Sequence, residues 1–582
     1  MGIFSQFLFL SLMAFWFISL AAYGTKTIHP DEKKALEDIA KSIGKKDWNF
    51  DIDPCSNKPN WVTPTIPHVY DNNVTCDCAI AGDNFCHVIW ISLKGQNLQG
   101  TLPPALSRLR YLQMIDFARN NLNGTIPKEW GVLTNIRKFA LLSNRLTGPI
   151  PAEIANISSL QLLEVHNNQL SGNLPSELGN LPEIQIMRFS SNNFTGELPL
   201  TFGKLTKLLE FRIDDNQFTG KIPDYVQNWT NINNLMMQGS GLSAPIPSGI
   251  SLLKNLTDLR ISDLNGSEYA PLPQLNNHTL LKTLILRNCN INGTLPEYFG
   301  TMTKLQLLDL SFNKLSGTIP RSYADMSGVN YIFLTGNLLT GQVPAFTKKT
   351  NLDVDLSYNN ITISKGSQKE NVNLFSTSDL SFTCPKPSKS LFINCGGSQE
   401  IVDGKTYEDD SGLGGPARFH AYPTGNWAFS TTGVLPGSKT VGESYSPHNI
   451  SKLTMVDSKL YTRARVSPIS LTYYGYCLQK GSYTVNLHFA EIMIPDDQTY
   501  ASLGRRVFDI YLQGKLVQKD FNIAKEAGGV GSKIVKQFNN IVVSSNTLEI
   551  RLYWAGKGTQ NLPINSVYGP LISAISVESS GA

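Results

Sequence analysis

The stretch "LSFNKLSGTIP", Leu310 to Pro320, decides the fold of this 582-residue chain. Close copies are "FARNNLNGTIP", which ends at Pro127, and "LLSNRLTGPIP", which ends at Pro151. Each copy keeps Asn, Leu, Gly and Pro at the same offsets. The glycines recur with a 24-residue step at Gly100, Gly124, Gly148, Gly172, Gly196 and Gly220, and the step resumes from Gly293 through Gly317 to Gly341. A fixed period of this size predicts a solenoid of stacked repeats.

The repeat reads L-x-x-L-x-L-x-x-N-x-L-x-G-x-x-P, and its leucines and its asparagine have separate structural roles. The L-x-L core predicts a short strand with its leucines inward. The turn after the strand leaves backbone groups facing the interior, and an Asn side chain can both donate to them and accept from them. We therefore expect a buried ladder of asparagines, formed by Asn120, Asn144, Asn168, Asn192, Asn216, Asn313 and Asn337.

One unit of the array is degenerate. Leu264 stands at its ladder position, and Cys289 takes the Asn position of the following unit. We expect Cys289 to be a buried free thiol, with a disulfide as the alternative.

The pattern resembles the plant-type leucine-rich repeat over residues 88–363, about eleven units. A solenoid needs its open ends covered. Residues 25–87 are expected to form the N-terminal cap, in which "HPDEKKALEDIAKSIG" predicts a helix that Asp31 caps and Gly44 ends. Residues 364–390 are expected to form a C-terminal cap or linker.

Four cysteines follow the predicted cap helix, at Cys55, Cys76, Cys78 and Cys86. A metal site is the rival interpretation, but the Cys-x-Cys spacing together with signs of export favours two disulfides. Four cysteines allow three pairings. The resemblance to the paired-cysteine caps of plant repeats implies Cys55–Cys76 and Cys78–Cys86.

The start of the chain predicts export. An apolar run from Phe7 to Leu20, followed by small residues, indicates a signal peptide over residues 1–24, with a signal anchor as the competing interpretation. Eleven Asn-x-Ser/Thr sequons fit a secreted glycoprotein, and some of them arise from the repeat itself. The sequons begin at Asn73, Asn123, Asn156, Asn193, Asn228, Asn255, Asn265, Asn277, Asn292, Asn360 and Asn449.

From "CPKPSKSLFINCGG", which begins at Cys384, the 24-residue rhythm is gone, and short strand-like runs follow. "YTVNLHFAEI" alternates apolar Val485, Leu487 and Phe489 with polar residues, which predicts half-buried strands of a β-sandwich. The words "NCGG", "YGYCLQKGSYTVNLHFAEI", "RRVFDIYLQGK" and "YGPLISAISV" resemble a malectin domain over residues 391–578, with 579–582 as a tail. The fold class is therefore mixed and mainly β.

The malectin resemblance carries two expectations about particular residues. It implies a disulfide between Cys395 and Cys477, with Cys384 as the odd cysteine or as a competitor for Cys395. It also implies an aromatic sugar-binding rim, which includes Tyr407, Tyr461, Tyr473 and Tyr474. The alternative is that these tyrosines pack between the sheets. The family's acidic sugar contact has no clear match in "INSVYGPLISAI".

Repeats followed by this domain resemble the ectodomain of one group of plant receptor-like Ser/Thr kinases. In that group a transmembrane helix and a kinase come next, whereas this chain carries neither H-R-D nor D-F-G. "GLGGPA" at Gly412 lies in a loop-like context and does not indicate a dinucleotide site. We therefore expect no catalysis by this chain, no cofactor and no metal.

The expected ligand surface is the concave face of the middle repeats, because its variable strand positions carry charge of both signs. These residues are Arg188, Glu210, Arg212, Asp214, Asp258, Arg260 and Arg287. Edge units add aromatic residues, Phe312, Tyr331, Phe333 and Tyr358, and the mixture favours a peptide or protein partner, including a co-receptor. Solvated charges without a partner are the alternative.

We expect a secreted or cell-surface recognition protein, either a receptor ectodomain or a soluble form of one. A lectin-like sensor of cell-wall carbohydrate and an extracellular enzyme inhibitor are the alternatives. The formal charge of +4, without a dense run of Lys or Arg, argues against nucleic acid as a partner. Contact with a membrane is expected only through a segment that this chain lacks.

Overall fold

A computed structural model of the chain describes residues 26–56, 58, 61–62, 71–346, 351–362, 372–375, 387–422, 426–434, 445–455, 458–560, 562 and 568–580. The predicted signal peptide lies outside these residues. The contacts within the chain separate two compact units. The first is Met1–Leu163 with Leu181–Glu183, and the second is Glu164–Asn180 with Ile184–Ala582.

The first unit begins with the predicted cap helix, α2 (Pro30–Ile43). Its apolar face is buried and consists of Ala35, Leu36, Ile39, Ala40 and Ile43. Gly44 ends the helix at φ +74°, as expected. The expected cap at Asp31 is wrong: His29 is the N-cap, and its imidazole accepts the Asp31 backbone N–H. The helix begins earlier because Pro30, which has no N–H to satisfy, suits the first helical position.

Two disulfides lie beside this helix. Cys55 is bonded to Cys76 and Cys78 is bonded to Cys86, with Cα–Cα distances of 5.5 Å and 4.1 Å. Cys76 lies in β1 (Asn73–Asp77), which pairs antiparallel with β2 (His87–Ser92), and Cys78 and Cys86 lie in the connection between these two strands.

A buried histidine joins the helix to β2. His87 Nδ1 lies 2.7 Å from Glu32 Oε1, and its Nε2 lies 2.8 Å from Asp83 Oδ2. The rings of His29 and Tyr111 pack beside it. Burial opposes charging of the imidazole, but the hydrogen bonds to the two carboxylates outweigh it and raise the pKa of His87.

The raised pKa predicts a pH-dependent cap. A group whose pKa is higher in the folded state stabilises that state fully below its unfolded pKa, and this stability is lost as pH rises through the folded pKa. Melting of the full chain should therefore show the cap weakening between about pH 6 and about pH 8, the range in which histidine titrates. The variant His87→Gln should flatten this dependence, whereas His448→Gln, at an exposed position, should not. An equal pH dependence in all three proteins would contradict the role of His87.

The repeats of the first unit follow β2. Their main strands β3 (Met114–Asp116) and β5 (Lys138–Ala140) continue the β2 sheet in parallel, and β7 (Leu162–Glu164) lies where the two units divide. Second strands β4 (Asn123–Gly124) and β6 (Arg145–Gly148) pair in parallel. A short 3-10 helix precedes the next main strand of each repeat: η1 (Pro104–Arg108), η2 (Lys128–Val132) and η3 (Ala152–Asn156).

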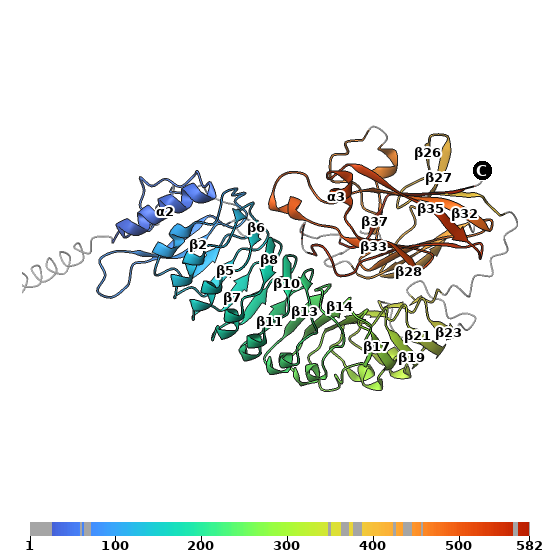
Figure 1. Ribbon diagram of the computed structural model, residues 1–582, viewed down its shortest axis with the longest axis horizontal. Coiled ribbons are helices and arrows are strands. Elements are labelled where there is room, and N and C mark those ends of the chain that lie inside the picture. Colours follow the sequence, from blue (N-terminus) through green and yellow to red (C-terminus); the bar gives the residue numbers. More distant parts are fainter. Residues whose placement is uncertain are drawn as a thin grey trace, which may run out of the picture. The chain divides into compact units, whose positions relative to one another are not determined.

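The repeats of the second unit have the same plan, and Figure 1 shows β11, β13 and β14 side by side. The main strands pair in parallel and are β9 (Ile186–Arg188), β11 (Glu210–Arg212), β13 (Asn234–Gln238), β14 (Asp258–Ser262), β16 (Thr283–Arg287), β18 (Leu307–Asp309), β20 (Tyr331–Phe333), β22 (Asp353–Asp355) and β24 (Val372–Asn373). The second strands form two ladders, β8 (Gln169–Asn173), β10 (Asn193–Gly196) and β12 (Gln217–Phe218), then β15 (Ala270–Pro271), β17 (Ile291–Thr294), β19 (Lys314–Thr318), β21 (Leu338–Gln342) and β23 (Asn360–Thr362). The 3-10 helices are η4 (Ser176–Asn180), η5 (Leu200–Lys204), η6 (Asp224–Asn228), η7 (Ser248–Leu252), η8 (Glu297–Thr301) and η9 (Arg321–Asp325).

The asparagine ladder is confirmed. Asn216 Nδ2 donates to the carbonyls of Phe189 and Ile213 at 3.1 and 3.0 Å, and its Oδ1 accepts from Phe194 N at 3.1 Å. Cys289, which occupies a ladder position, is a buried free thiol. Its Sγ donates to the Arg287 carbonyl at 3.2 Å and so replaces one of the hydrogen bonds that an asparagine makes there. Leu264, at the other irregular position, is buried as an apolar residue.

The chain then forms the predicted β-sandwich, called here the C-terminal sandwich (described residues from 387 onward). One sheet has the order β26 (Glu400–Val402), β27 (Lys405–Asp409), β25 (Ser390–Asn394), β38 (Ala574–Ser579), β32 (Gly481–Ala490) and β35 (Lys533–Val543). The other has the order β28 (Ala417–Ala421), β29 (Trp427–Thr432), β31 (Ser470–Gly475), β36 (Leu548–Tyr553), β33 (Phe508–Leu512) and β34 (Lys515–Phe521). Further elements are β30 (Arg465–Val466), paired with β37 (Leu571–Ile572), η12 (Lys459–Tyr461), η13 (Tyr500–Leu503) and α3 (Ile523–Ala527). As predicted, Val485, Leu487 and Phe489 point into the core.

The expected disulfide between Cys395 and Cys477 is wrong. Cys395 is a free, fully buried thiol, whereas Cys477 is disulfide-bonded to another cysteine. The two residues follow strands of different sheets, β25 and β31, and they pack in different apolar clusters. Cys384 lies outside the described residues.

Candidate functional site

The concave face of the middle repeats carries arginines paired with carboxylates. Arg188 Nε lies 2.5 Å from Glu210 Oε1, and the same guanidinium contacts Glu164. Arg212 also pairs with Glu210, so four charged side chains from β7, β9 and β11 are linked. Burial opposes charging of both Arg188 and Glu210, but their ion pairs raise the pKa of Arg188 and lower that of Glu210. Both groups therefore stay charged.

A second pair lies two strands further on. Arg260 Nε and Nη2 donate to the two oxygens of Asp258, each at 2.7 Å, in a bidentate contact. The Arg260 side chain is 30% exposed, close to the 27% of Arg212. These two guanidiniums and that of Arg188, which is 28% exposed, are the partly accessible cations of the predicted surface.

Three of the predicted ligand-binding residues, Glu210, Asp214 and Arg287, are buried instead. Asp214 accepts hydrogen bonds from Gln238 N at 2.8 Å and from Ser190 Oγ at 2.9 Å, and burial raises its pKa. Only 1% of the Arg287 side chain is exposed, and its guanidinium lies 3.1 Å from Asp263 and 3.5 Å from Asp309. These side chains are therefore not openly exposed on the concave face in the described structure, and their contact with a ligand stays a prediction.

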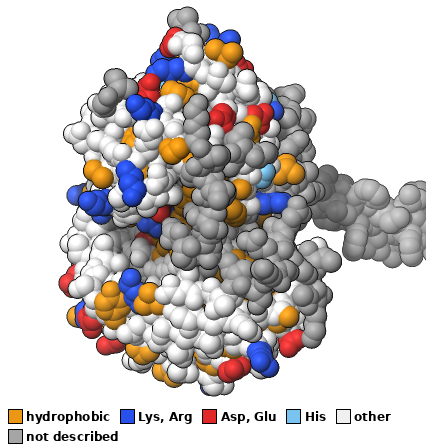
Figure 2. Space-filling view, turned by 90° about the vertical axis from the view of Figure 1, so that its right-hand side faces the viewer, with side chains coloured by type: hydrophobic (Ala, Val, Ile, Leu, Met, Phe, Trp, Pro, Cys, Tyr) orange, Lys and Arg blue, Asp and Glu red, His pale blue; other side chains and the backbone are white. Residues whose placement is uncertain are grey.

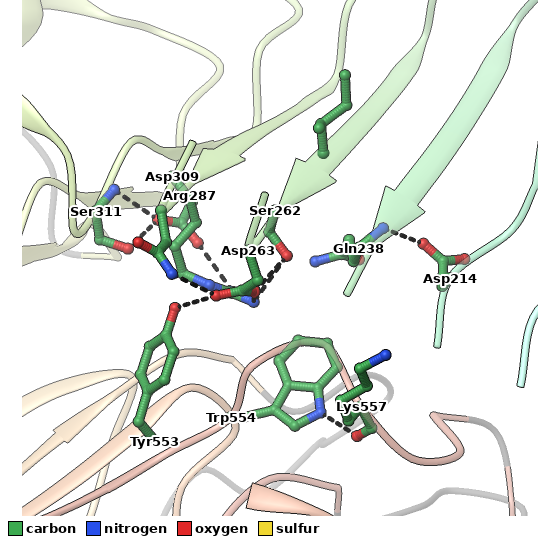
Figure 3. A network of polar contacts seen from close by, with 12 residues as sticks. Asp214, Gln238, Ser262, Asp263, Arg287, Asp309, Ser311, Tyr553, Trp554 and Lys557 are labelled. Atoms are coloured by element: carbon green, nitrogen blue, oxygen red, sulfur yellow. Dashed lines mark hydrogen bonds and ion pairs between the residues drawn. The ribbon is translucent and has the colours of Figure 1, made fainter. Parts of the chain in front are cut away.

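The burial of Arg287 comes from the C-terminal sandwich, as Figure 3 shows. Tyr553 OH donates to Asp263 Oδ1 at 2.6 Å, and the Trp554 ring centroid lies 5.0 Å from the Arg287 guanidinium carbon. The sequence pattern of the repeats gave no sign of this cover, because the covering residues lie more than 200 positions away in the chain.

Among the described residues, two cavities lie beside the covering segment. The first, of about 180 Å³, has Arg260, Arg287 and Asp309 on its repeat side and Trp554, Gln560 and Tyr568 on its sandwich side. The second, of about 170 Å³, is lined by Arg188, Arg212 and Asp214 and shares Gln560 with the first. The Arg287 Nε–H is buried without a hydrogen-bond acceptor, although the other guanidinium nitrogens are paired.

The four tyrosines expected to bind sugar are all buried. Tyr407, Tyr461 and Tyr473 belong to the core of the C-terminal sandwich, and Tyr474 packs in a smaller cluster with Phe375. Tyr461 OH lies 3.1 Å from His488 Nδ1, and Tyr473 OH donates to Asp410 at 2.5 Å. The tyrosines do not form an exposed aromatic rim in the described structure.

Nine of the eleven sequon asparagines are exposed, and Asn193 and Asn449 are half-buried. The exposed ones remain the predicted glycan positions, and the two half-buried ones are the least accessible. Figure 2 shows positive and negative side chains interspersed over one face of the molecule. Within the described part of the chain, we find no helix with the length and apolar character needed to cross a bilayer.

Comparison with known protein families identifies both parts of the chain. Residues 389–575 match the malectin domain, and residues 279–339 and 159–181 match leucine-rich repeats. The chain is a leucine-rich-repeat protein with a malectin domain. The C-terminal sandwich is therefore called the malectin domain from here on.

The relatives of this leucine-rich-repeat and malectin protein are plant receptor kinases. One probable LRR receptor-like serine/threonine-protein kinase of Arabidopsis thaliana is 45% identical over an alignment of 628 residues, gaps included. The alignment covers 95% of this chain and 57% of the relative. A second such kinase of Arabidopsis thaliana is 48% identical over 581 residues, which cover 96% of this chain and 56% of the relative. The chain thus spans little more than half the length of these relatives.

A solved structure with a similar repeat fold is the LRR ectodomain of the plant membrane receptor kinase GASSHO1/SCHENGEN3 from Arabidopsis thaliana, in complex with CASPARIAN STRIP INTEGRITY FACTOR 2. Its sequence identity to this chain is 26% and the TM-score is 0.50. The match covers 60% of this chain and 44% of that one.

Proposed function

We propose that this chain is the extracellular ligand-recognition region of a plant cell-surface receptor and that it binds a peptide or protein on the concave face of its middle repeats. The observation that carries the proposal is the pair of partly exposed guanidiniums, Arg212 and Arg260, beside polar and aromatic cavities. Each arginine is held by a carboxylate, which orders its donors for a partner. The relatives named as receptor kinases support a receptor role.

The proposed location is the extracellular face of the plasma membrane or the extracellular space. The support is the apolar start of the chain, the exposed sequons and the receptor kinase relatives. Carbohydrate binding by the malectin domain is the second candidate, although the burial of the four tyrosines speaks against it. The alternative role, an extracellular enzyme inhibitor, gives no function to the malectin domain.

A direct test screens the glycosylated full chain on two arrays, one of synthetic secreted-type peptides and one of cell-wall glycans. We expect peptide binding that falls about tenfold in the double variant Arg212→Glu with Arg260→Glu, mostly through a slower association rate at low salt. The matched control reverses two exposed charges elsewhere, Lys34→Glu with Lys221→Glu. Glycan binding without peptide binding would overturn the proposal, as would equal affinity in both double variants.

A further inference from the structure

One column of turn residues in the second unit contacts the malectin domain. Each member immediately precedes a ladder position and has a positive φ between 49° and 58°. The members that contact the malectin domain, called here the turn column, are Ser191, Asp215, Gly239, Asp263, Phe312 and Tyr358. Because the repeats stack in register, these residues line up along one edge of the main sheet.

Polar members of the column meet matching groups of the malectin domain. Arg505 Nη2 donates to Asp215 Oδ2 at 2.8 Å, and Tyr553 OH donates to Asp263 Oδ1. Lys557 Nζ donates to the carbonyl of the ladder residue Asn216 at 2.5 Å. The acceptors of Arg505 and Lys557 thus lie on adjacent residues of one repeat, and the acceptor of Tyr553 lies in another repeat.

Apolar members extend the contact toward the C-terminal repeats. The Phe312 and Tyr553 rings meet edge to face at a centroid distance of 5.0 Å. Tyr358 is hydrogen-bonded to Tyr474, whose ring packs on Phe375 at 4.4 Å. Two apolar clusters thereby contain residues of both domains. Apolar area removed from water in this way favours a lasting contact rather than a transient one.

The tightest point is a contact between two glycines. A Cβ on Gly239 would lie 2.6 Å from the Ala555 carbonyl oxygen, and a Cβ on Gly556 would lie 2.5 Å from Gly239 N. These distances are too short for any side chain, so the two backbones touch only because both residues are glycine. Gly239 stands in the column where its neighbours are aspartates, Asp215 and Asp263.

We propose that the turn column is a docking surface for the malectin domain and that the two form one composite binding body. A ligand of the middle repeats then lies beside Trp554–Gln560, in contact with both domains, rather than on an open sheet. The contact between the turn column and the malectin domain does not depend on the proposed function. Only the placement of the ligand depends on the proposed function.

The test needs no ligand. Hydrogen exchange followed by mass spectrometry is measured on the full chain with Gly239→Val and, separately, with Gly556→Val. We expect Gly239→Val in the repeats to raise the exchange of the Tyr553–Gly558 amides about tenfold, because the docking contact protects them. Gly556→Val should do the same for the amides around Gly239.

The matched controls are Gly293→Val in the repeats and Gly514→Val in the malectin domain. Both glycines have positive φ, and a Cβ there would meet nothing within 4 Å, so these variants carry the backbone strain without the clash. If Gly239→Val and Gly556→Val exchange like their controls, the docking is wrong.

Should either valine variant fail to fold, the pair Asp215→Ala and Arg505→Ala decides the question. These single variants should each raise exchange in the opposite domain, and their double variant should add little, because both remove one ion pair. No effect across the interface from either single variant would overturn the proposal.

Discussion

Replacing Asp410 by alanine should remove about 3–5 kcal/mol from the free energy of unfolding of the malectin domain, because it leaves a buried guanidinium without its partner. Neither Asp410 nor Arg465 has an exposed side chain, and Arg465 Nη2 donates to Asp410 Oδ1 at 2.7 Å. The same carboxylate accepts from Gly396 N at 2.8 Å and from Tyr473 OH at 2.5 Å. Its removal would leave these donors buried and unpaired as well.

The measurement is denaturant unfolding of the full chain, followed by near-ultraviolet circular dichroism of the aromatic core. Glu578→Ala is the control, because Glu578 pairs with Lys405 on the surface of the same domain, where both side chains are more than 40% exposed. That change should cost at most about 1 kcal/mol. Equal losses in the two variants would contradict the structural role assigned to Asp410.

Replacing Arg287 by alanine should cost a similar amount, about 3–5 kcal/mol, and the loss should depend on pH. Asp309 would stay buried without its cation, and burial already raises its pKa. A carboxyl whose folded pKa is raised destabilises the folded state as pH climbs above its unfolded pKa. The variant should therefore lose more stability at about pH 8 than at about pH 5, since protonation removes the charge at low pH.

Thermal unfolding at the two pH values measures this effect. Arg260→Ala is the control, because Arg260 has one half-buried partner and is itself 30% exposed. It should cost at most about 1 kcal/mol. Arg287→Ala could instead lose as little stability as Arg260→Ala, or lose the same amount at both pH values. Either result would mean that the buried network of Figure 3 adds little to stability.

The solenoid was predictable because its signal is local and repeated. Asn216 satisfies backbone groups in its own turn and in the neighbouring repeat, so the chemistry of one side chain fixes its position in every copy. Alternation along β32 likewise placed Val485 and Leu487 in a core. These interactions depend on short sequence distances or on strict periodicity, and both are visible in one sequence.

The docking of the malectin domain was not predictable in this way. The turn column uses serine, aspartate, glycine, phenylalanine and tyrosine, so no residue type marks it. Arg287 looked like a ligand contact because its strand position faces outward, and the sequence does not show that Trp554 covers it. The disulfide error has a similar origin, because the sequence does not show that Cys395 and Cys477 pack in separate apolar clusters.

The most direct test of the composite recognition surface is a hydrogen-exchange footprint of a peptide bound to the full chain. The peptide is one found on the array, compared with a scrambled version of it. If the composite surface binds the peptide, exchange should slow in β11 (Glu210–Arg212), in β14 (Asp258–Ser262) and in the malectin segment Trp554–Gln560. Protection confined to the malectin domain around Tyr407 and Tyr461, with none on the concave strands, would contradict this prediction.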